Sequence, residues 1–478
     1  GSIQSARQDA TTLTRLEILR KSRSLVQNNP LAQKIVDVFV RYTVGDGINP
    51  IPMSEDENWN RAALRWFLGW NRYAHLESRM TFFDLQRIIA SSAFVDGDIL
   101  SNHVLSPSTG RPRLQLIEGH RIGHSKNWGQ DDVWDGVQID GNGRPIYFFR
   151  YDRFENFLTY LPAGEPVPME ADHVVLHHFP TRVGQVRGLS KFTPVLTLLQ
   201  DLRDTLEIEM QALKNNASID HIIQRKGGEI LVDELEERIG NINPTPVTGD
   251  TVHTPPVDPK YFYRTMFGPE VKILDEDDEY KPWESKRPTP EFTAFLKSQG
   301  EMICHGIGMS PFSVFGHSDE GGVAHRTLLE QDDRFFRTHS AQLSRQFQRT
   351  WDFVINWAQE MGEIADEDGN ALTRPRDWQN VDWHPPRRIT ADHRHDAKSA
   401  IELCRAGLLN AKKYYGDRNE DWRREFRQNA EETLFAQKLS DEIFARDGIR
   451  IDPKDIRDLG RQPQQPQQPQ QAGGITNE

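Results

Sequence analysis

The sequence predicts an α+β fold that is mainly helical. Apolar residues recur every three or four positions over several long stretches, which is typical of amphipathic helices. One stretch, residues 98–179, instead has short β-branched and aromatic runs separated by turns, which is typical of strands. The 24 Phe and 11 Trp among 478 residues can supply a large core, and this chain length suggests two to four domains.

The N-terminal part is predicted to be helical. Asn28-Asn29-Pro30 separates the first two helices, and Pro30 suits a first helical position. Gly45-Asp46-Gly47 ends the second helix. The expected helices cover residues 13–26, 31–44, 60–70 and 81–95.

A strand-rich region follows. Asp140-Gly141-Asn142-Gly143 lies between two apolar runs and is a strong hairpin motif. The expected strands cover residues 98–105, 113–118, 133–140, 145–151 and 173–179.

A long helix is predicted from Val195 to Ala217, where the apolar residues form one stripe. Its other faces are mostly acidic. The next segment, 219–288, contains a short acidic helix at 232–239 and several prolines, and it is predicted to be a small separate module.

The remaining elements are again mainly helical. The run 323–361 lacks Pro and Gly, and as one helix it would be about 58 Å long. Residues 309–322 are predicted as a loop, 378–388 as extended, and 461–478 as a disordered Gln-rich tail. The other expected helices cover residues 291–306, 392–407, 409–416 and 420–446.

Composition excludes several classes of protein. With 58 Lys and Arg against 71 Asp and Glu, the net charge is −13, which disfavours tight binding to DNA phosphates. Two cysteines cannot form a disulfide framework or a Cys-rich zinc site. No apolar run approaches the 18 residues of a membrane span, and the first residues lack the features of a secretory signal.

No catalytic motif is found. Phosphate-binding loops, nucleophile elbows and His-Glu-x-x-His are absent from the sequence. The candidate clusters are better explained structurally: strand histidines, a turn instead of a calcium loop, a solvated acidic run, and a Cys-His pair whose side chains diverge. These clusters are His173, His177 and His178; His384, His393 and His395; Asp366, Asp368 and Asn370; 275–279; and Cys304 with His305.

Four segments in the same order resemble the lambda-like family of tailed-phage portal proteins. The most distinctive is His178-Phe179 followed by Arg182-Val183-Gly184-Gln185-Val186-Arg187-Gly188-Leu189-Ser190. At the start of the long helix, where the family often has Ser-Ser-x-Arg, this chain has Val323-Ala324-His325-Arg326, so only the Arg is kept. The other segments are 24–32 with 44–48, 303–311, and 406–410 with Gly416-Asp417.

The resemblance implies a homo-oligomeric ring, typically of twelve copies, at the capsid's portal vertex in the virion, assembled in the host cytoplasm. Double-stranded DNA would pass through it without sequence specificity. Its implied partners are the terminase large subunit, a head-completion or adaptor protein, and the major capsid and scaffolding proteins. No catalysis, cofactor, metal or membrane is implied.

The family's parts are the wing, stem, clip, tunnel loop and crown. The predicted boundaries are wing 1–190 and 362–391, stem helices 191–218 and 289–308, clip 219–288, tunnel loop 309–322, a long wing-to-crown helix 323–361, crown 392–460 and tail 461–478.

Two sets of residues are candidates for facing DNA. Acidic groups on the first stem helix would weaken contacts with phosphates and let DNA slide; a solvated outer face is the alternative. These channel-lining candidates are Asp201, Asp204, Glu207, Glu209 and Lys214. The tunnel-loop candidates are Phe315, Gly316, His317, Ser318, Asp319, Glu320, Gly321 and Gly322, with the last two glycines predicted to give the loop its freedom.

Other assignments remain open at this point. The alternatives are a metal-dependent phage nuclease or prohead protease, or another structural protein of the capsid vertex such as an adaptor. Large rings would distinguish a portal from these. Arg182 and Arg187 are expected to be structural ion-pair partners and not DNA contacts.

Overall fold

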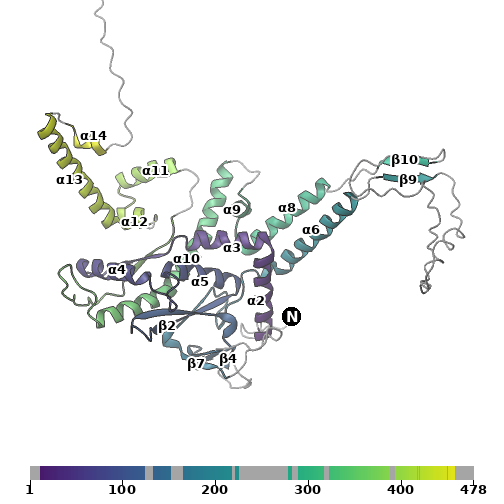
Figure 1. Ribbon diagram of the computed structural model, residues 1–478, viewed down its shortest axis with the longest axis horizontal. Coiled ribbons are helices and arrows are strands. Elements are labelled where there is room, and N and C mark those ends of the chain that lie inside the picture. The colour runs from purple at the N-terminus through teal and green to yellow at the C-terminus, as the bar shows by residue number, and fades with distance from the viewer. Residues whose placement is uncertain are drawn as a thin grey trace, which may run out of the picture. The chain divides into compact units, whose positions relative to one another are not determined.

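The structure is a computed structural model, drawn as a ribbon in Figure 1. The chain divides into two compact units. One unit comprises Gly1–Gln200 and Gln299–Glu478, and the other comprises Asp201–Ser298. The residues described are 11–123, 133–151, 165–217, 221–225, 278–282, 289–316, 322–387, 393–416, 418, 420–448 and 451–457.

The predicted N-terminal helices are confirmed, and their ends have clear causes. Asn29 accepts hydrogen bonds from the N–H groups of Leu31 and Ala32 and so caps the second helix, which begins with Pro30. Thr81 and Asp84 form a capping box at the fourth. The four helices are α2 (Thr12–Asn28), α3 (Pro30–Thr43), α4 (Glu57–Asn71) and α5 (Phe82–Val95).

The β-rich region forms two antiparallel sheets. One has the order β3-β2-β8 and the other the order β4-β5-β6-β7. The predicted run 133–140 is broken into two strands by Asp135 and Gly136, which both have positive φ. The strands are β2 (Asp98–Leu105), β3 (Pro112–Glu118), β4 (Val133–Trp134), β5 (Val137–Ile139), β6 (Pro145–Arg150), β7 (Val167–Glu170) and β8 (Val174–His178).

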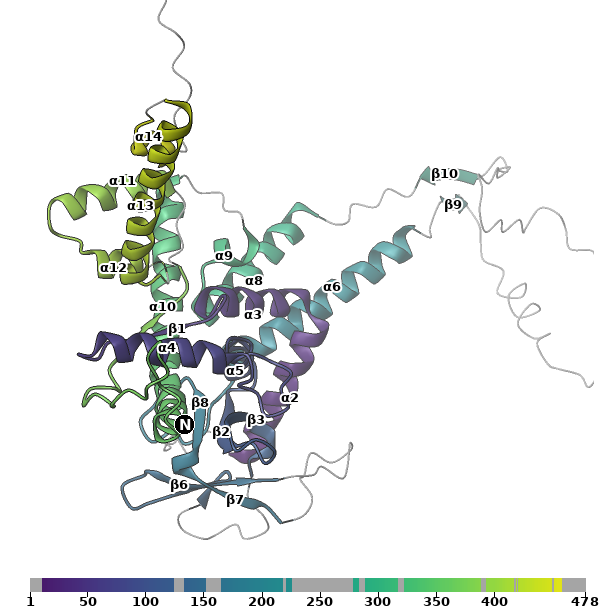
Figure 2. The same cartoon turned by 60° about the vertical axis from the view of Figure 1, so that its left-hand side comes forward.

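The strands of the two sheets lie near each other in Figure 2, and the two sheets share one apolar core. Leu100 and Ile117 from the first sheet are fully buried with Val137 and Phe148 from the second. Short 3₁₀ turns at Gly119–Arg121 and Ala171–His173 connect strands at the rim of this core. The hairpin predicted at Asp140 joins β5 and β6 as expected.

The long helix α10 (Gly322–Glu360) is the central element of the first unit. All six apolar residues whose spacing predicts it are buried: Phe336, Leu343, Phe347, Trp351, Val354 and Ala358. It contacts α3, α4, α9, β3, β8 and β11. Helices and strands from both the N-terminal and the C-terminal half of the chain therefore pack against this one helix.

A two-stranded ribbon pairs distant parts of the chain. β1 (Asn49–Pro52) lies antiparallel to β11 (Val381–His384), with Asn49 opposite His384. The extended prediction for 378–388 agrees with β11, whereas β1 is not predicted by the sequence. The C-terminal helices that follow are α11 (His393–Arg405), α12 (Ala411–Gly416), α13 (Trp422–Asp447) and α14 (Pro453–Arg457).

The second unit contains parts of two helices and a short ribbon. The helices are α6 (Leu196–Ala217), preceded by a 3₁₀ turn at Thr193–Val195, and α8 (Pro290–Ile307), both as predicted. The ribbon pairs β9 (His221–Arg225) with β10 (Asp278–Pro282). The predicted acidic helix at 232–239 and the Pro-rich segment lie outside the described residues. No helix in the described part of the chain has the length and apolarity needed to cross a bilayer.

Candidate functional site

The segment predicted as a tunnel loop contains a short helix, α9 (Pro311–Phe315). The hydroxyl of Ser310 accepts a hydrogen bond from the N–H of Ser313, and a proline occupies the first helical position. Gly316 ends the helix with φ 78°, a left-handed conformation that glycine adopts without strain. The loop prediction is wrong here, although Ser-Pro followed by Gly is a helix start-and-stop pattern.

The structure places three of the eight tunnel-loop candidates. Phe315 is the last residue of α9 and its side chain is 41% exposed. Gly322 is the first residue of α10, so the helix predicted from 323 begins one residue earlier than expected. The other candidates, His317, Ser318, Asp319, Glu320 and Gly321, lie outside the described residues.

One buried carboxylate attaches α9 to α10. Asp332 accepts a hydrogen bond from the N–H of Ser310 at 2.8 Å, and it also accepts from the hydroxyls of Ser310 and Ser313. Its side chain is 2% exposed. A buried carboxylate that accepts three hydrogen bonds is fully paired. These bonds hold the start of the predicted tunnel-loop segment against α10.

The other end of α9 lies against α8. A Cβ at Gly300 would come 3.0 Å from Cζ of Phe315, so the aromatic ring lies close to the helix backbone there. Gly308 has φ 99°, and a Cβ there would come 2.9 Å from the ring of Phe335. Gly308 is required because its φ is positive and a Cβ would meet the ring of Phe335, whereas a Cβ at Gly300 would need only a small shift of the partly exposed Phe315 ring.

The stem-helix candidates do not share one face of α6. Successive residues of an α-helix are about 100° apart, which places Asp201 and Asp204 about 60° apart on the side away from the apolar stripe. Glu207 and Lys214 lie on one flank, where Arg203 donates to Glu207 at 2.9 Å. Glu209 lies on the opposite flank. A straight helix therefore cannot present all five residues to one channel wall.

The apolar stripe of α6 is buried only along its first part. Leu199 is fully buried and Leu202 is 9% exposed, whereas Leu206 and Met210 are 40% and 53% exposed. The same stripe thus continues onto a surface that the described chain leaves exposed. Such a surface suits contact with another chain.

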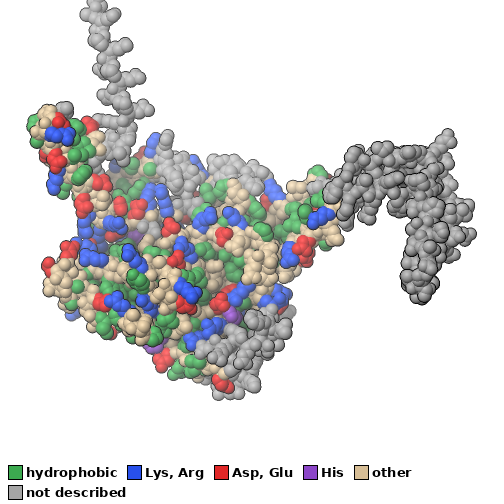
Figure 3. Space-filling model, viewed as in Figure 1, with side chains coloured by type: hydrophobic (Ala, Val, Ile, Leu, Met, Phe, Trp, Pro, Cys, Tyr) green, Lys and Arg blue, Asp and Glu red, His purple; other side chains and the backbone are tan. Residues whose placement is uncertain are grey.

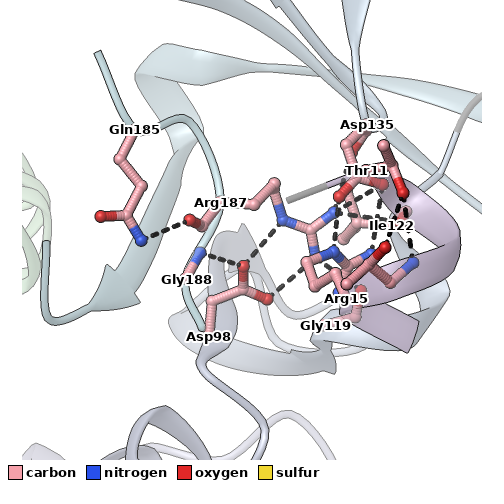
Figure 4. Close-up of polar contacts among 10 residues, drawn as sticks. Thr11, Arg15, Asp98, Gly119, Ile122, Asp135, Gln185, Arg187 and Gly188 are labelled. Carbon is pink, nitrogen blue, oxygen red and sulfur yellow. Dashed lines mark hydrogen bonds and ion pairs between the residues drawn. The ribbon is translucent and has the colours of Figure 1, made fainter. Parts of the chain in front are cut away.

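The motif Arg-x-Gly-Gln-x-Arg-Gly-x-Ser forms a buried polar network (Figure 4). Arg187 donates two hydrogen bonds of 2.8 Å to Asp98, and its remaining N–H groups donate to the backbone carbonyls of Gly119, Ile122 and Asp135. All five guanidinium donors are used. Arg187 is therefore structural, as predicted; Arg182 is exposed, and its role as an ion-pair partner stays a prediction.

Gly188, the next residue of the motif, also has a structural cause. A Cβ at Gly188 would come 1.9 Å from the carbonyl oxygen of Gly97, so only glycine fits. Burial favours the neutral form of Asp98, but Arg187 outweighs it and lowers the pKa of this carboxyl to about 2. Arg15 forms a second buried ion pair, with Asp135. The network joins α2 to the sheets and contains no group poised for proton transfer.

The candidate histidine cluster is not a metal site. His177 is fully buried, with Nε2 2.8 Å from Ser101 Oγ and Nδ1 3.0 Å from Gln346 Oε1. His173 precedes β8 in a 3₁₀ turn, so the prediction that it shares a strand face with His177 is wrong. Among the described residues no three His, Cys, Asp or Glu side chains are placed to hold a metal ion.

The remaining candidates have structural explanations where they are described. Asp366 accepts hydrogen bonds from the N–H groups of Asp368 and Asn370, which confirms a turn. Burial raises the pKa of Cys304 to about 12, so its thiol is a poor nucleophile. His384 is a buried residue of β11. The side chains of His393, His395 and residues 275–279 lie outside the described ones.

Comparison with known proteins identifies a family. The family described as "Phage portal protein, lambda family" matches residues 2–337. No curated protein matches the chain.

Solved structures with similar chains include two from gene transfer agent (GTA) particles. The neck of an empty GTA particle with C6 symmetry contains a chain that is 14% identical, with a TM-score of 0.48 and coverage of 82% of this chain and 92% of that chain. The virion of a native GTA particle gives 14% identity, a TM-score of 0.48, and coverage of 84% and 91%.

Proposed function

The chain belongs to the lambda family of phage portal proteins, structural proteins of the capsid's portal vertex in the virion, and from this premise we propose that its copies form a closed ring that conducts double-stranded DNA. The single observation that carries the proposal is the family match over residues 2–337. A portal is not an enzyme, which agrees with the structural roles of Arg187 and His177.

The ring is proposed to contain twelve copies. A closed ring repeats one contact in which each copy presents two different surfaces to its neighbours. The exposed apolar residues of α6 and α8, among them Met210 and Phe295, provide such surfaces. The partners of the ring would be the terminase large subunit, a head-completion or adaptor protein, and the major capsid and scaffolding proteins.

The parts of the ring are proposed from the family. The wing would comprise residues 1–190 and 362–391, and α10 would lead from it to the crown. The stem would be α6 and α8, with the clip at 219–288 between them. The tunnel loop would be the segment 316–321, which follows α9.

The stem acids are proposed to keep DNA mobile. Carboxylates repel phosphates, whereas each additional Lys or Arg contact strengthens DNA binding through counterion release. The geometry of α6 divides the candidates into the pair Asp201 and Asp204, the flank of Glu207 and Lys214, and the opposite flank of Glu209. We expect only one of these groups to face the channel.

Native mass measurement of the purified chain, combined with electron microscopy, tests the ring. Closed rings with a central hole wide enough for a duplex are expected. A compact monomer would contradict the proposal. DNA packaging in vitro with empty capsids then tests conduction: capsids assembled without this chain should protect no DNA from nuclease.

A further inference from the structure

The C-terminal helices bury almost none of their own apolar side chains. Of the side chains described between 397 and 457, only Ala436 and Ser440 are buried. Helices without a core to pack against are marginally stable in water. These helices therefore require a partner. Their exposed large apolar residues are Ile401, Leu403, Leu408, Phe426, Leu434, Phe435 and Phe444.

The longest of these helices, α13, exposes apolar residues in several outward directions, and Phe426 and Phe444 share one of them, about 80° from Leu434 on the side away from Phe435. Ala436 and Ser440 define its inner face, and α14 packs against this helix. Leu434 and Phe435 are 61% and 67% exposed, and as consecutive residues they lie about 100° apart on the outer side. Figure 3 shows apolar side chains between charged ones on the surface of these helices. One flat partner could not cover both directions.

We propose that α13 is a contact between neighbouring copies of this chain, with the Leu434 side of one copy against the Phe435 side of the next. This inference rests on the proposed ring, because rotation about one axis gives every copy a neighbour on each of two different sides. It commits to a second copy as the partner.

Residue spacing supports this pairing. Within about 40° of Leu434, α13 carries Arg423, Arg427, Ala430, Lys438, Asp441 and Ala445, and within about 40° of Phe435 it carries Arg424, Gln428, Glu431, Leu439, Glu442 and Arg446. Two copies that run in the same direction, tilted against the ring axis so that neighbours are staggered by four to five residues, about 7 Å, place several of these residues opposite complementary ones. The pairs are Ala430 with Phe435, Leu434 with Leu439, Lys438 with Glu442, and Asp441 with Arg446.

These pairs match in size and in charge. The large ring of Phe435 meets the small Ala430, and both cross-copy ion pairs join opposite charges. Arg446 contacts Asp447 of its own chain at 2.7 Å on an exposed surface, an arrangement that costs little to exchange. Three of the pairs are five residues apart in sequence and one is four, so a stagger of about 7 Å serves all four.

Disulfide cross-linking of the full-length chain tests the contact. The exposed Cys404 is first replaced by Ser; Cys304 is buried and stays. Ala430→Cys and Phe435→Cys in the same chain should, on mild oxidation, give a ladder of covalent multimers up to the full ring. Each single variant alone should give none, because the two positions meet only each other.

A matched pair controls for random collision. Gln428→Cys with Thr433→Cys has the same spacing on α13 but does not place one cysteine on each side of the proposed contact. Three outcomes would each overturn the contact. The first is that native mass shows rings but oxidation gives no ladder; the second is that the control pair cross-links equally well; the third is that one of the single variants forms dimers. Absence of rings would instead overturn the proposed function, and the contact with it.

Charge exchange gives a second test. Asp441→Lys places two bases opposite each other and should weaken each contact about two- to fivefold, as expected for an exposed ion pair. Asp441 and Arg446 lie about 140° apart on one helix, so they cannot pair within a chain. Adding Arg446→Glu to the same chain should therefore restore ring stability against salt only through a neighbouring copy. A double variant weaker than Asp441→Lys alone would contradict the pairing.

Discussion

Asp332 of α10 holds Ser310, the residue that caps α9, through two hydrogen bonds, one from the N–H and one from the hydroxyl. These bonds link the start of the segment predicted as a tunnel loop, 309–322, to the long helix that follows it. Helices α9 and α10 are therefore fixed to each other at this point.

Asp332→Ala should release α9. Ser310 and Ser313 would lose a charged acceptor, and hydrogen bonds to charged groups contribute about 1.5 to 3 kcal/mol each. We expect amide hydrogen exchange in 311–315 to rise roughly a hundredfold, as a loss of about 3 kcal/mol implies. Asp333→Ala is the control, because Asp333 pairs with Arg337 on its own helix. Equal exchange in both variants would contradict the role of Asp332.

Gly316 and Gly322 should respond oppositely to alanine. Gly316 has φ 78°, where a side chain costs roughly 1 to 2 kcal/mol, so Gly316→Ala should lower the thermal stability of α9 and alter DNA retention. Gly322→Ala should be neutral or slightly stabilising, since Ala favours a helix by up to about 1 kcal/mol. Packaging assays and native mass distinguish these effects from failed assembly. An unchanged Gly316→Ala variant would refute this account.

Removing Arg187 should destabilise the first unit strongly. Arg187→Met leaves the buried Asp98 without its partner, which typically costs about 3 to 5 kcal/mol. Denaturant unfolding checks this value. Arg182→Met, in the same loop but exposed, should change stability by less than about 0.5 kcal/mol. Adding Asp98→Asn to Arg187→Met should recover part of the loss.

Mild acid should destabilise the fold through buried histidines. Burial lowers the pKa of His177 and His339 to about 4 and of His103 to about 3. The unfolded chain, with pKa near 6.5, binds protons that the folded chain excludes, so stability is lost as pH falls below about 6.5. Each histidine should contribute about 2 kcal/mol of loss at pH 5.

Urea unfolding at pH 7 and pH 5 measures this loss. The free energy of unfolding should differ less between pH 7 and pH 5 in His177→Gln, by the contribution of one histidine, about 2 kcal/mol. His173→Gln should leave it unchanged, because the His173 side chain is 63% exposed. A pH difference equal in all three proteins would exclude His177 as one of its causes.

Substitutions on α6 should reveal which face meets DNA. If Asp201 and Asp204 line the channel, changing both to Asn should slow DNA passage and increase DNA retention at low salt, because repulsion of phosphates is lost. Glu209→Gln, on another face, should then have no effect. Packaging rates at two salt concentrations check this. An effect of Glu209→Gln alone would assign the channel to the other flank.

Helices with a strong apolar period could be predicted from the sequence. The spacing of Phe336, Leu343 and Trp351 gives the burial of α10 correctly, because the pattern and the packing have the same period. The interpretation of Arg187 as structural is also confirmed. The motif segments led to the family that the comparison then established.

The missed elements depend on contacts between distant residues. β1 contains Pro50 and Pro52 and forms only because it pairs with β11, more than 300 residues later. Asp98 meets Arg187, 89 residues away, and nothing local predicts that partner. Helix α9 is different, because its start and stop residues, Ser310, Pro311 and Gly316, are visible in the sequence. A helix of five residues is too short to show an apolar period, so the pattern of apolar residues does not predict it.

Helix α10 contains no Pro, and no Gly after its first residue. Its second half is held by aromatic contacts, including Phe347 with Phe82 and Trp351 with Phe67. Sharp kinks in helices arise at Pro, Gly or bulges, so the stretch between Gly322 and these contacts has no residue that favours a hinge. A displacement beside Gly322 would therefore tilt the helix as one body against the aromatic residues around Phe347 and Trp351.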